Sequence, residues 1–206
     1  KSKLIEVEKS NFNYLLKRIK NQYFDNKGNI ENLAFALEIA KKFKIKDKII
    51  VKALNKFKGL PHRQEIIFTN KNITCINDSK ATSFDASLQS LSSYNKIFWI
   101  VGGLPKYKDN FYLKNVKKKI IKAYIIGKST YFFKKQIKNY APYTISKNIS
   151  KAVDDVYKDL RLKQNSKGTI LFSPAAASFD QFSNFENRGN YFKKVISRKF
   201  NFRKNA

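Results

Sequence analysis

Methionine is absent from the 206-residue sequence, and cysteine and histidine each occur only once. Because a complete gene product normally begins with methionine, we expect the chain to be part of a longer protein. The single Cys75 excludes an internal disulfide and indicates the reducing cytoplasm. No apolar run approaches the ~18 residues that a membrane span needs. The sequence also lacks GxxxxGK[ST] and any Cys/His metal spacing, so it has neither the usual ATP phosphate loop nor a predicted metal ligand.

Acidic residues are scarce as well. The 43 Lys and Arg residues outnumber 15 Asp and Glu residues and give a net charge of +28. One interpretation is a basic nucleic-acid-binding module, because cations gathered on one face release phosphate counterions. The other is compositional bias, since only six of the 43 are arginine and the lysines are spread over the whole length. We favour the second and expect no specific nucleic acid, although this charge should concentrate anionic substrates.

The hydrophobic pattern changes near residue 59. Before it, helical spacing predicts helices over residues 29–43, with Asn29 as the N-cap, and 47–57. The residues predicted to face inward are Leu33, Ala36, Leu37, Ala40 and Phe43 in the first helix, and Ile49, Ile50, Ala53, Leu54 and Phe57 in the second. The GLPHR segment at 59–63 is rich in helix breakers. We therefore predict two domains, 1–58 and 59–206.

After residue 63, strands and helices alternate. A hairpin is predicted around residues 70–71, followed by strands at 96–101, 123–126, 143–145 and 169–172. Helices are predicted at 82–93, 111–119, 130–139, 149–160 and 184–198. The continuous apolar run KIFWIV at 96–101 is typical of the centre of a parallel sheet. This rhythm predicts an α/β fold, a Rossmann-like sheet flanked by helices.

Three loops rich in small and polar residues follow predicted strands. They are INDSKAT (76–82), GGLPKYKD (102–109) and SPAAASFDQF (173–182). In such sheets ligands bind at the carboxyl ends of the strands, so the loops should line one cleft. In the first loop, Asp78 could bind ribose hydroxyls or a cation, and Lys80 could neutralise a phosphate. Thr82 could donate a hydrogen bond from its hydroxyl. The ordinary alternatives are helix capping for Asp78 and Thr82 and a solvated side chain for Lys80.

The other two loops and the linker add candidates. Lys106 is the cation closest to the double glycine, and Ser178 follows three alanines that let a ligand approach the backbone. Phe185 could be a plain core residue. We expect the lone His62 to be structural, whereas Arg63 beside it could grip a nucleotide.

Taken together, these motifs resemble one family. GLPHR-x-E, INDSKAT, the double glycine with a lysine after it, and SPAAASFDQF-x-NFE-x-RG occur in an order and spacing similar to the C-terminal half of the Mur ligases. The resemblance is to the branch that adds D-glutamate. It covers residues 29–206, and its last motif is the most specific. GNIEN at 28–32 is similar to the family's HNxxN helix start, with glycine in place of the histidine.

The resemblance implies a cytoplasmic ATP-dependent ligase, monomeric at full length. It would join D-glutamate to UDP-N-acetylmuramoyl-L-alanine through an acyl phosphate in peptidoglycan synthesis. Residues 1–58 would be the end of the central ATP-binding domain and 59–206 the D-glutamate-binding domain. The phosphate loop and Mg²⁺ ligands would lie upstream, so the chain alone should be inactive. A related ligase for another amino acid, such as a folate-polyglutamate enzyme, is disfavoured by the final motif.

The resemblance also implies residue roles. The D-glutamate pocket would be formed by Thr82, Lys106, Ser178 and Phe185. The adenosine part of ATP would contact Asn29, Arg63 and Asp78. Lys80 would act near the phosphates or the glutamate as the catalytic lysine. Two departures affect these roles: Ser83 replaces the family's usual asparagine, and the loop GGLPKYKD makes Lys108 a rival to Lys106.

Overall fold

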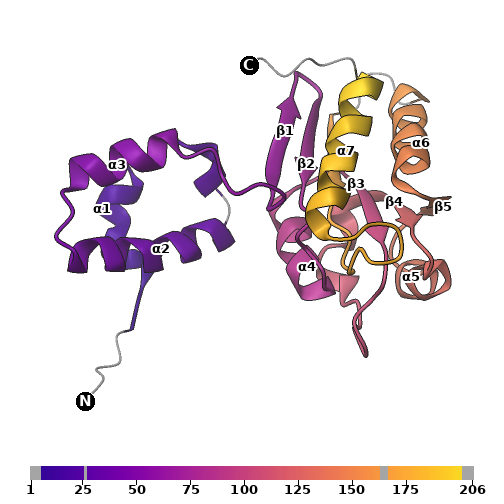
Figure 1. Cartoon of the computed structure of the whole chain (residues 1–206), viewed down its shortest axis with the longest axis horizontal. Coiled ribbons are helices and arrows are strands. Elements are labelled where there is room, and N and C mark those ends of the chain that lie inside the picture. Colours follow the sequence, from indigo (N-terminus) through magenta and orange to yellow (C-terminus); the bar gives the residue numbers. More distant parts are fainter. Residues whose placement is uncertain (1–5, 26, 163–166, 201–206) are drawn as a thin grey trace. The chain divides into compact units, whose positions relative to one another are not determined.

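The computed structural model describes residues 6–25, 27–162 and 167–200. The chain divides into two compact units, Lys1–Gly59 and Leu60–Ala206 (Figure 1). Each unit has a hydrophobic core of its own.

The unit Lys1–Gly59 is helical. Its α-helices are α1 (Asn13–Leu16), α2 (Lys27–Lys42) and α3 (Asp47–Lys56). Short 3-10 helices precede α1 at Lys9–Phe12 and α2 at Gln22–Phe24. The buried side chains that these elements share are Phe12, Leu15, Phe24, Leu33, Ala34, Leu37 and Ile50. Burying these side chains is the main force that can hold such short helices in place.

For α2, the expected N-cap and part of the expected inward face were wrong. Asn29 is not an N-cap: it lies inside α2, and its Nδ2 donates a hydrogen bond to the Tyr23 carbonyl at 2.6 Å. Phe43 lies beyond the end of α2 and is 76% exposed. The physical reason is that α2 carries two overlapping apolar stripes. The stripe that contains Leu33 and Leu37 packs into the core together with Ala34, so Ala36 and Phe43 stay exposed to solvent.

A similar selection occurs in α3. Ile50 is buried, whereas Ile49 is 58% exposed and Ala53 is exposed. Phe57 follows the helix and is 37% exposed, although its ring stacks on that of Phe24 at 5.9 Å. The predicted inward face of α3 was therefore only partly right, because a narrow row of apolar side chains is enough to cover the small core of this unit.

The described residues of the unit Leu60–Ala206 form a six-stranded sheet in the order β1-β2-β6-β3-β4-β5. Its strands are β1 (Glu65–Thr69), β2 (Ile73–Asn77), β3 (Ile97–Gly102), β4 (Ile120–Ile126), β5 (Tyr143–Lys147) and β6 (Gly168–Phe172). β1 pairs antiparallel with β2 through the predicted hairpin, and all other pairs are parallel. The predicted α/β sheet is therefore confirmed.

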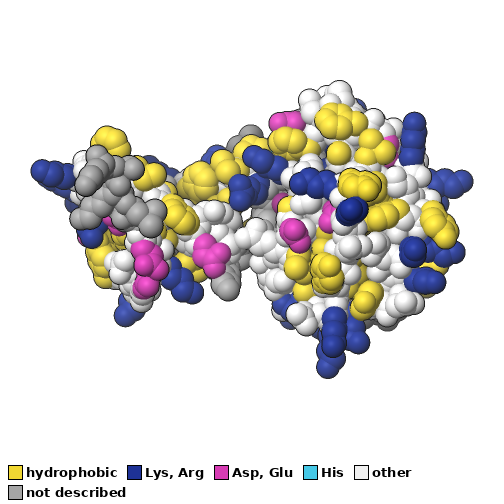
Figure 2. Space-filling view, turned by 90° about the horizontal axis from the view of Figure 1, so that it is seen from below, with side chains coloured by type: hydrophobic (Ala, Val, Ile, Leu, Met, Phe, Trp, Pro, Cys, Tyr) yellow, Lys and Arg dark blue, Asp and Glu magenta, His cyan; other side chains and the backbone are white. Residues whose placement is uncertain are grey.

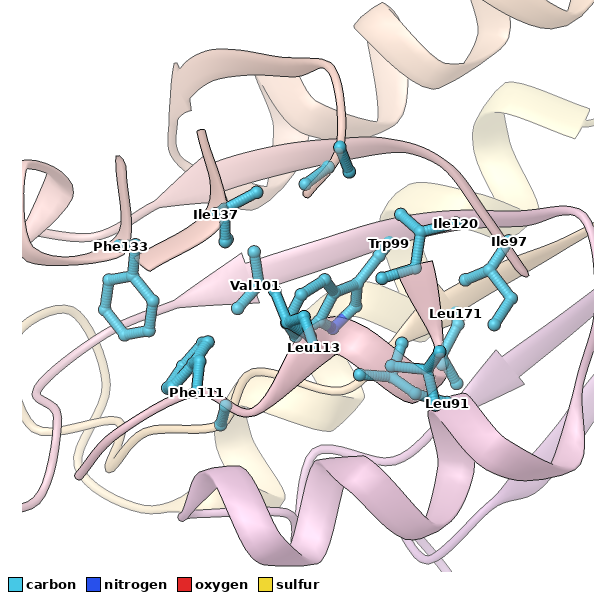
Figure 3. Close-up of a cluster of buried hydrophobic side chains, with 14 of the residues drawn as sticks. Leu91, Ile97, Trp99, Val101, Phe111, Leu113, Ile120, Phe133, Ile137 and Leu171 are labelled. Atoms are coloured by element: carbon cyan, nitrogen blue, oxygen red, sulfur yellow. The ribbon is translucent and has the colours of Figure 1, made fainter. Parts of the chain in front are cut away.

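Helices cover both faces of this sheet. On one face lie α4 (Phe84–Ser93) and α5 (Thr130–Ile137), and on the other α6 (Ile149–Leu162) and α7 (Phe185–Phe200). The central strand β3 is buried on both sides, as its continuous apolar run predicts. Trp99 and Val101 face the α4 and α5 side (Figure 3), while Phe98 and Ile100 face α6 and α7.

The predicted helix over residues 111–119 was wrong. The segment instead contains two 3-10 helices, Leu113–Asn115 and Lys117–Lys119. The Phe111 amide donates to Oε1 of Gln136 at 3.3 Å, and the ring of Phe111 stacks on that of Phe84 at 4.3 Å. This anchoring fixes the start of the segment in a non-helical conformation, so the backbone does not wind into one α-helix.

Candidate functional site

The three loops singled out from the sequence lie at the carboxyl edge of the sheet. They follow β2, β6 and β3, which are neighbours in the sheet. In Figure 1 these loops lie at the lower end of the unit Leu60–Ala206, and Figure 2 views the unit from that side. The topology therefore brings together loops that are about 100 residues apart in the sequence.

The double-glycine loop and the serine-alanine loop are bonded to each other directly. Leu104 and Ala177 exchange backbone hydrogen bonds of 3.0 and 2.8 Å, and the Gly102 amide donates to the Pro174 carbonyl at 2.9 Å. Ser178 follows this pairing at once, and Lys106 comes two residues after it. Ser178 is 2% exposed, whereas Lys106 is exposed. The loops that carry these two predicted substrate residues thus form one continuous piece of structure.

The double-glycine loop also reaches the start of α4. Oδ2 of Asp109 accepts a hydrogen bond from the Phe84 amide at 2.9 Å. Ser83 occupies the N-cap position but makes no side-chain capping bond within the described residues. Asp109 therefore caps α4 from a distant loop, beside the half-buried Thr82. The sequence signal for this role is the aspartate that ends GGLPKYKD, a residue to which the motif alone gave no function.

Asp78 is buried within a hydrogen-bond network. One carboxylate oxygen accepts from the Gln64 amide at 3.2 Å, and the other accepts from Oγ of Ser90 at 2.6 Å and Oγ of Ser173 at 2.8 Å. Burial raises the pKa of Asp78 to about 6, although these hydrogen bonds and the charge of Arg63 oppose the shift. Asp78 thus joins the β2 loop to β6 and α4, and a contact with adenosine stays a prediction.

The raised pKa of Asp78 predicts a pH-dependent stability. The folded chain keeps the carboxyl proton up to about pH 6, while the unfolded chain releases it near pH 4. Between these values the folded state binds more protons, so the unfolding free energy falls as pH rises. The full shift corresponds to about 3 kcal/mol.

Asparagine does not titrate, so the Asp78→Asn variant should lack this pH-dependent contribution. Its unfolding free energy should therefore rise relative to that of the original chain as the pH increases from 4 to 7. Urea unfolding followed by the fluorescence of the single tryptophan, Trp99, measures the difference. Stability curves that stay parallel across this range would contradict the assignment.

His62 and Asn77 form a second buried group. Nδ2 of Asn77 lies 2.9 Å from Nδ1 of His62 and 3.0 Å from Oε2 of Glu65. Since the amide donates, Nδ1 of His62 accepts, and the ring proton lies on Nε2. Burial and the charge of Lys193 lower the pKa of His62. The structural role expected for His62 agrees with this packing.

Lys80 and Phe185 lie where the INDSKAT loop meets the start of α7. Oγ of Ser79 donates to the Phe185 carbonyl at 2.8 Å. The Lys80 amide donates to the His62 carbonyl at 3.0 Å, while its exposed ammonium lies 5.7 Å from the centre of the Phe185 ring. The half-buried Phe185 ring and the Lys80 ammonium therefore share one surface.

The other predicted site residues, Arg63, Asn29 and Lys106, lie in different surroundings. Arg63 is half-buried on the linker that precedes β1, and its charge acts on Asp78. Asn29 belongs to the unit Lys1–Gly59. Lys106 and Lys108 are both exposed, but Lys108 lies over the Tyr107 ring at 5.3 Å.

Charge on the visible face is dispersed. In Figure 2, Lys and Arg side chains lie around the unit Leu60–Ala206 and are separated by uncharged surface. Within residues 6–25, 27–162 and 167–200, no three His, Cys, Asp or Glu side chains gather where a metal ion could bind. None of the helices in these ranges has the length and apolar character needed to cross a membrane.

Comparison with known proteins identifies relatives for most of the chain. No family model matches it. The UDP-N-acetylmuramoylalanine--D-glutamate ligase of Rickettsia felis is 37% identical over 170 residues, which are 82% of this chain and 38% of that protein. The ligase of the same name from Rhizobium meliloti is 39% identical over 164 residues, 80% of this chain and 35% of that protein. The chain thus spans little more than a third of the length of these relatives.

A solved structure supports the fold. Mycobacterium tuberculosis folylpolyglutamate synthase, solved in complex with ADP and AMPPCP, matches with a TM-score of 0.52 and 12% identity over 86% of this chain and 41% of that one. At this identity the likeness concerns architecture only. The sequence relatives confirm the resemblance stated from the motifs: the chain belongs to the Mur ligase family, and the relatives that it matches over about 80% of its length bear the name UDP-N-acetylmuramoylalanine--D-glutamate ligase.

Proposed function

We propose that this chain is the C-terminal, D-glutamate-binding part of an ATP-dependent ligase that joins D-glutamate to UDP-N-acetylmuramoyl-L-alanine. The observation that carries the proposal is the junction of three loops at the carboxyl edge of one sheet, in a chain whose relatives bear this ligase name. The unit Leu60–Ala206 would bind the amino acid, and Lys1–Gly59 would be the end of a central ATP-binding domain. The complete enzyme would be a cytoplasmic monomer.

D-glutamate offers two carboxylates and one amine that must stay free to react. The exposed ammonium of Lys106 would pair with a carboxylate. The hydroxyls of Thr82 and Ser178 would donate further hydrogen bonds, and Phe185 would form the wall beside them. Ser178 is buried on the segment that pairs with the lysine's own loop, so these groups could act on one ligand. The net charge of +28 would favour the approach of this dianion.

ATP would supply the phosphoryl group that activates the substrate carboxylate. Among the residues predicted to contact its adenosine, Arg63 is half-buried and can reach a ligand with its guanidinium. Asp78 is less suited to a direct contact, because both its oxygens already accept hydrogen bonds. The exposed Lys80 would stabilise charge that develops on phosphoryl oxygens. Ligands for Mg²⁺ and the phosphate loop would come from the part of the enzyme that the relatives have in addition.

A chimeric enzyme tests the proposal. In the Rickettsia felis ligase, the matched 170-residue region would be replaced by the matching region of this chain. We expect ADP release that requires both UDP-N-acetylmuramoyl-L-alanine and D-glutamate, with L-glutamate as the negative control. The chain alone should release no ADP, because it lacks the phosphate loop. A folded chimera that binds the nucleotide-sugar substrate but ignores D-glutamate would contradict the assignment.

A further inference from the structure

Arg188, in the Arg-Gly pair near the start of α7, has no role in the proposed function but lies where the three loops meet. The side chain is only 2% exposed. Nε donates to Oγ of Ser79 at 3.1 Å, and Nη2 donates to the Ser79 carbonyl at 2.8 Å. Ser79 in turn donates from Oγ to the Phe185 carbonyl at 2.8 Å. The guanidinium therefore ties the INDSKAT loop to the start of α7 by two bonds of fixed geometry.

The third loop touches the same guanidinium. A Cβ atom placed on Gly103 would lie 3.3 Å from Nη1 of Arg188 and 2.4 Å from the Ala177 carbonyl oxygen. Gly103 also has a φ of +138°, which side-chain-bearing residues rarely adopt. Glycine is therefore needed for this close approach. The double-glycine loop packs against Arg188 on one side and against Ala177 on the other.

The guanidinium is retained at an energetic cost. Nη1 has no hydrogen-bond partner among the described residues, and buried donors of this kind are rare. Burial lowers the pKa of Arg188 to about 10, so the group still carries its charge at neutral pH. An apolar side chain of similar size would fill the space without this penalty. Unpaired buried groups of this kind concentrate where function opposes stability.

We propose that Arg188 is a positioning residue, which fixes the INDSKAT loop and the double-glycine loop relative to α7 so that Thr82, Lys106 and Ser178 face one ligand. Nε and Nη2 of Arg188 both donate to Ser79, which explains the choice of arginine, because a lysine ammonium cannot reproduce this planar fork. The loop-positioning step stands on the contacts of the chain itself. Its consequence for D-glutamate rests on the proposed function.

Hydrogen exchange in the isolated chain tests the positioning step. The Ser79 and Lys80 amides are protected by bonds to Oδ1 of Asn77 at 3.2 Å and to the His62 carbonyl at 3.0 Å. In Arg188→Lys, we expect both amides and that of Leu104 to exchange at least tenfold faster. The Ala123 amide in β4 should keep its rate. The matched control is Arg198→Lys, which changes an exposed arginine on the same helix and should move none of these rates.

A double-mutant cycle separates loop positioning from general loss of stability. Ser79→Ala removes the hydroxyl that Nε contacts, so its effect on the Lys80 and Leu104 amides should not add to that of Arg188→Lys. Additive effects, or uniform acceleration that includes Ala123, would overturn the proposal.

In the chimeric ligase, Arg188→Lys should raise the D-glutamate KM at least tenfold and leave the KM for UDP-N-acetylmuramoyl-L-alanine within twofold. An unchanged D-glutamate KM with faster loop exchange would refute the functional consequence alone. A chimera inactive before mutation would refute the proposed function and leave the exchange result to decide on positioning.

Discussion

Replacing Gly102 with alanine should lower the unfolding free energy of the unit Leu60–Ala206 by roughly 4 kcal/mol or more. An added Cβ would lie 2.0 Å from the Ile126 carbonyl oxygen of the neighbouring strand, a backbone atom that cannot move away alone. The φ of Gly102 is +133°, so alanine would also be strained without that contact. The combined penalty approaches the whole stability of an ordinary small domain.

Urea unfolding monitored by Trp99 checks this expectation, because the buried indole lies on the same strand. The matched comparison is Gly168→Ala. There an added Cβ would lie 2.8 Å from the Lys96 carbonyl oxygen and 2.9 Å from the Phe98 ring, with no left-handed φ to add strain. This variant should lose roughly 1–3 kcal/mol. Equal losses in the two variants would show that backbone strain at Gly102 contributes nothing.

Removing the ammonium of Lys106 should have the largest effect on catalysis. In the chimeric ligase, Lys106→Ala is expected to raise the D-glutamate KM roughly 10- to 100-fold, the range for a lost charge-assisted hydrogen bond. The turnover number should change less, because this lysine is proposed to bind the amino acid rather than the reacting phosphoryl group. Steady-state kinetics at saturating ATP provides the measurement.

Lys108→Ala is the natural control for that experiment, since it removes an equal charge from the same exposed loop. Its ammonium lies over the Tyr107 ring, a contact within the loop itself. We expect less than a threefold change in KM. If Lys108→Ala has the larger effect, the carboxylate partner is Lys108 and the assignment from the glycine spacing fails.

Much of the α/β unit could be predicted from the sequence because its strands carry strong local signals. The apolar run of β3 and the hairpin before Asn77 each predicted the observed elements closely. The loops were found for the same reason, since each follows a strand directly. The failures came where tertiary contacts decided the outcome: Phe111 is anchored by Gln136, and Asn29 is drawn into α2 by the Tyr23 carbonyl.

The internal connections of the candidate site were harder to predict. Asp109 caps a helix that begins 25 residues earlier in the chain, and Arg188 contacts Ser79 across 109 residues. Neither contact has a local spacing that could reveal it. The motif string did include Arg188, but it gave no sign that the side chain would be buried with one nitrogen that has no hydrogen-bond partner in the part of the chain that the structure describes.

The position of β6 has a consequence for the order in which the protein can assemble. This strand pairs with both β2 and β3, yet it is the last of the described strands to be synthesised. Until residues 168–172 emerge from the ribosome, the β1-β2 hairpin and the β3-β4-β5 sheet each expose an open edge to other chains. A nascent chain stopped before β6 should therefore be prone to aggregation and dependent on chaperones. Pairing of β6 completes the sheet in one late step, which the large sequence separation of its partners should make slow.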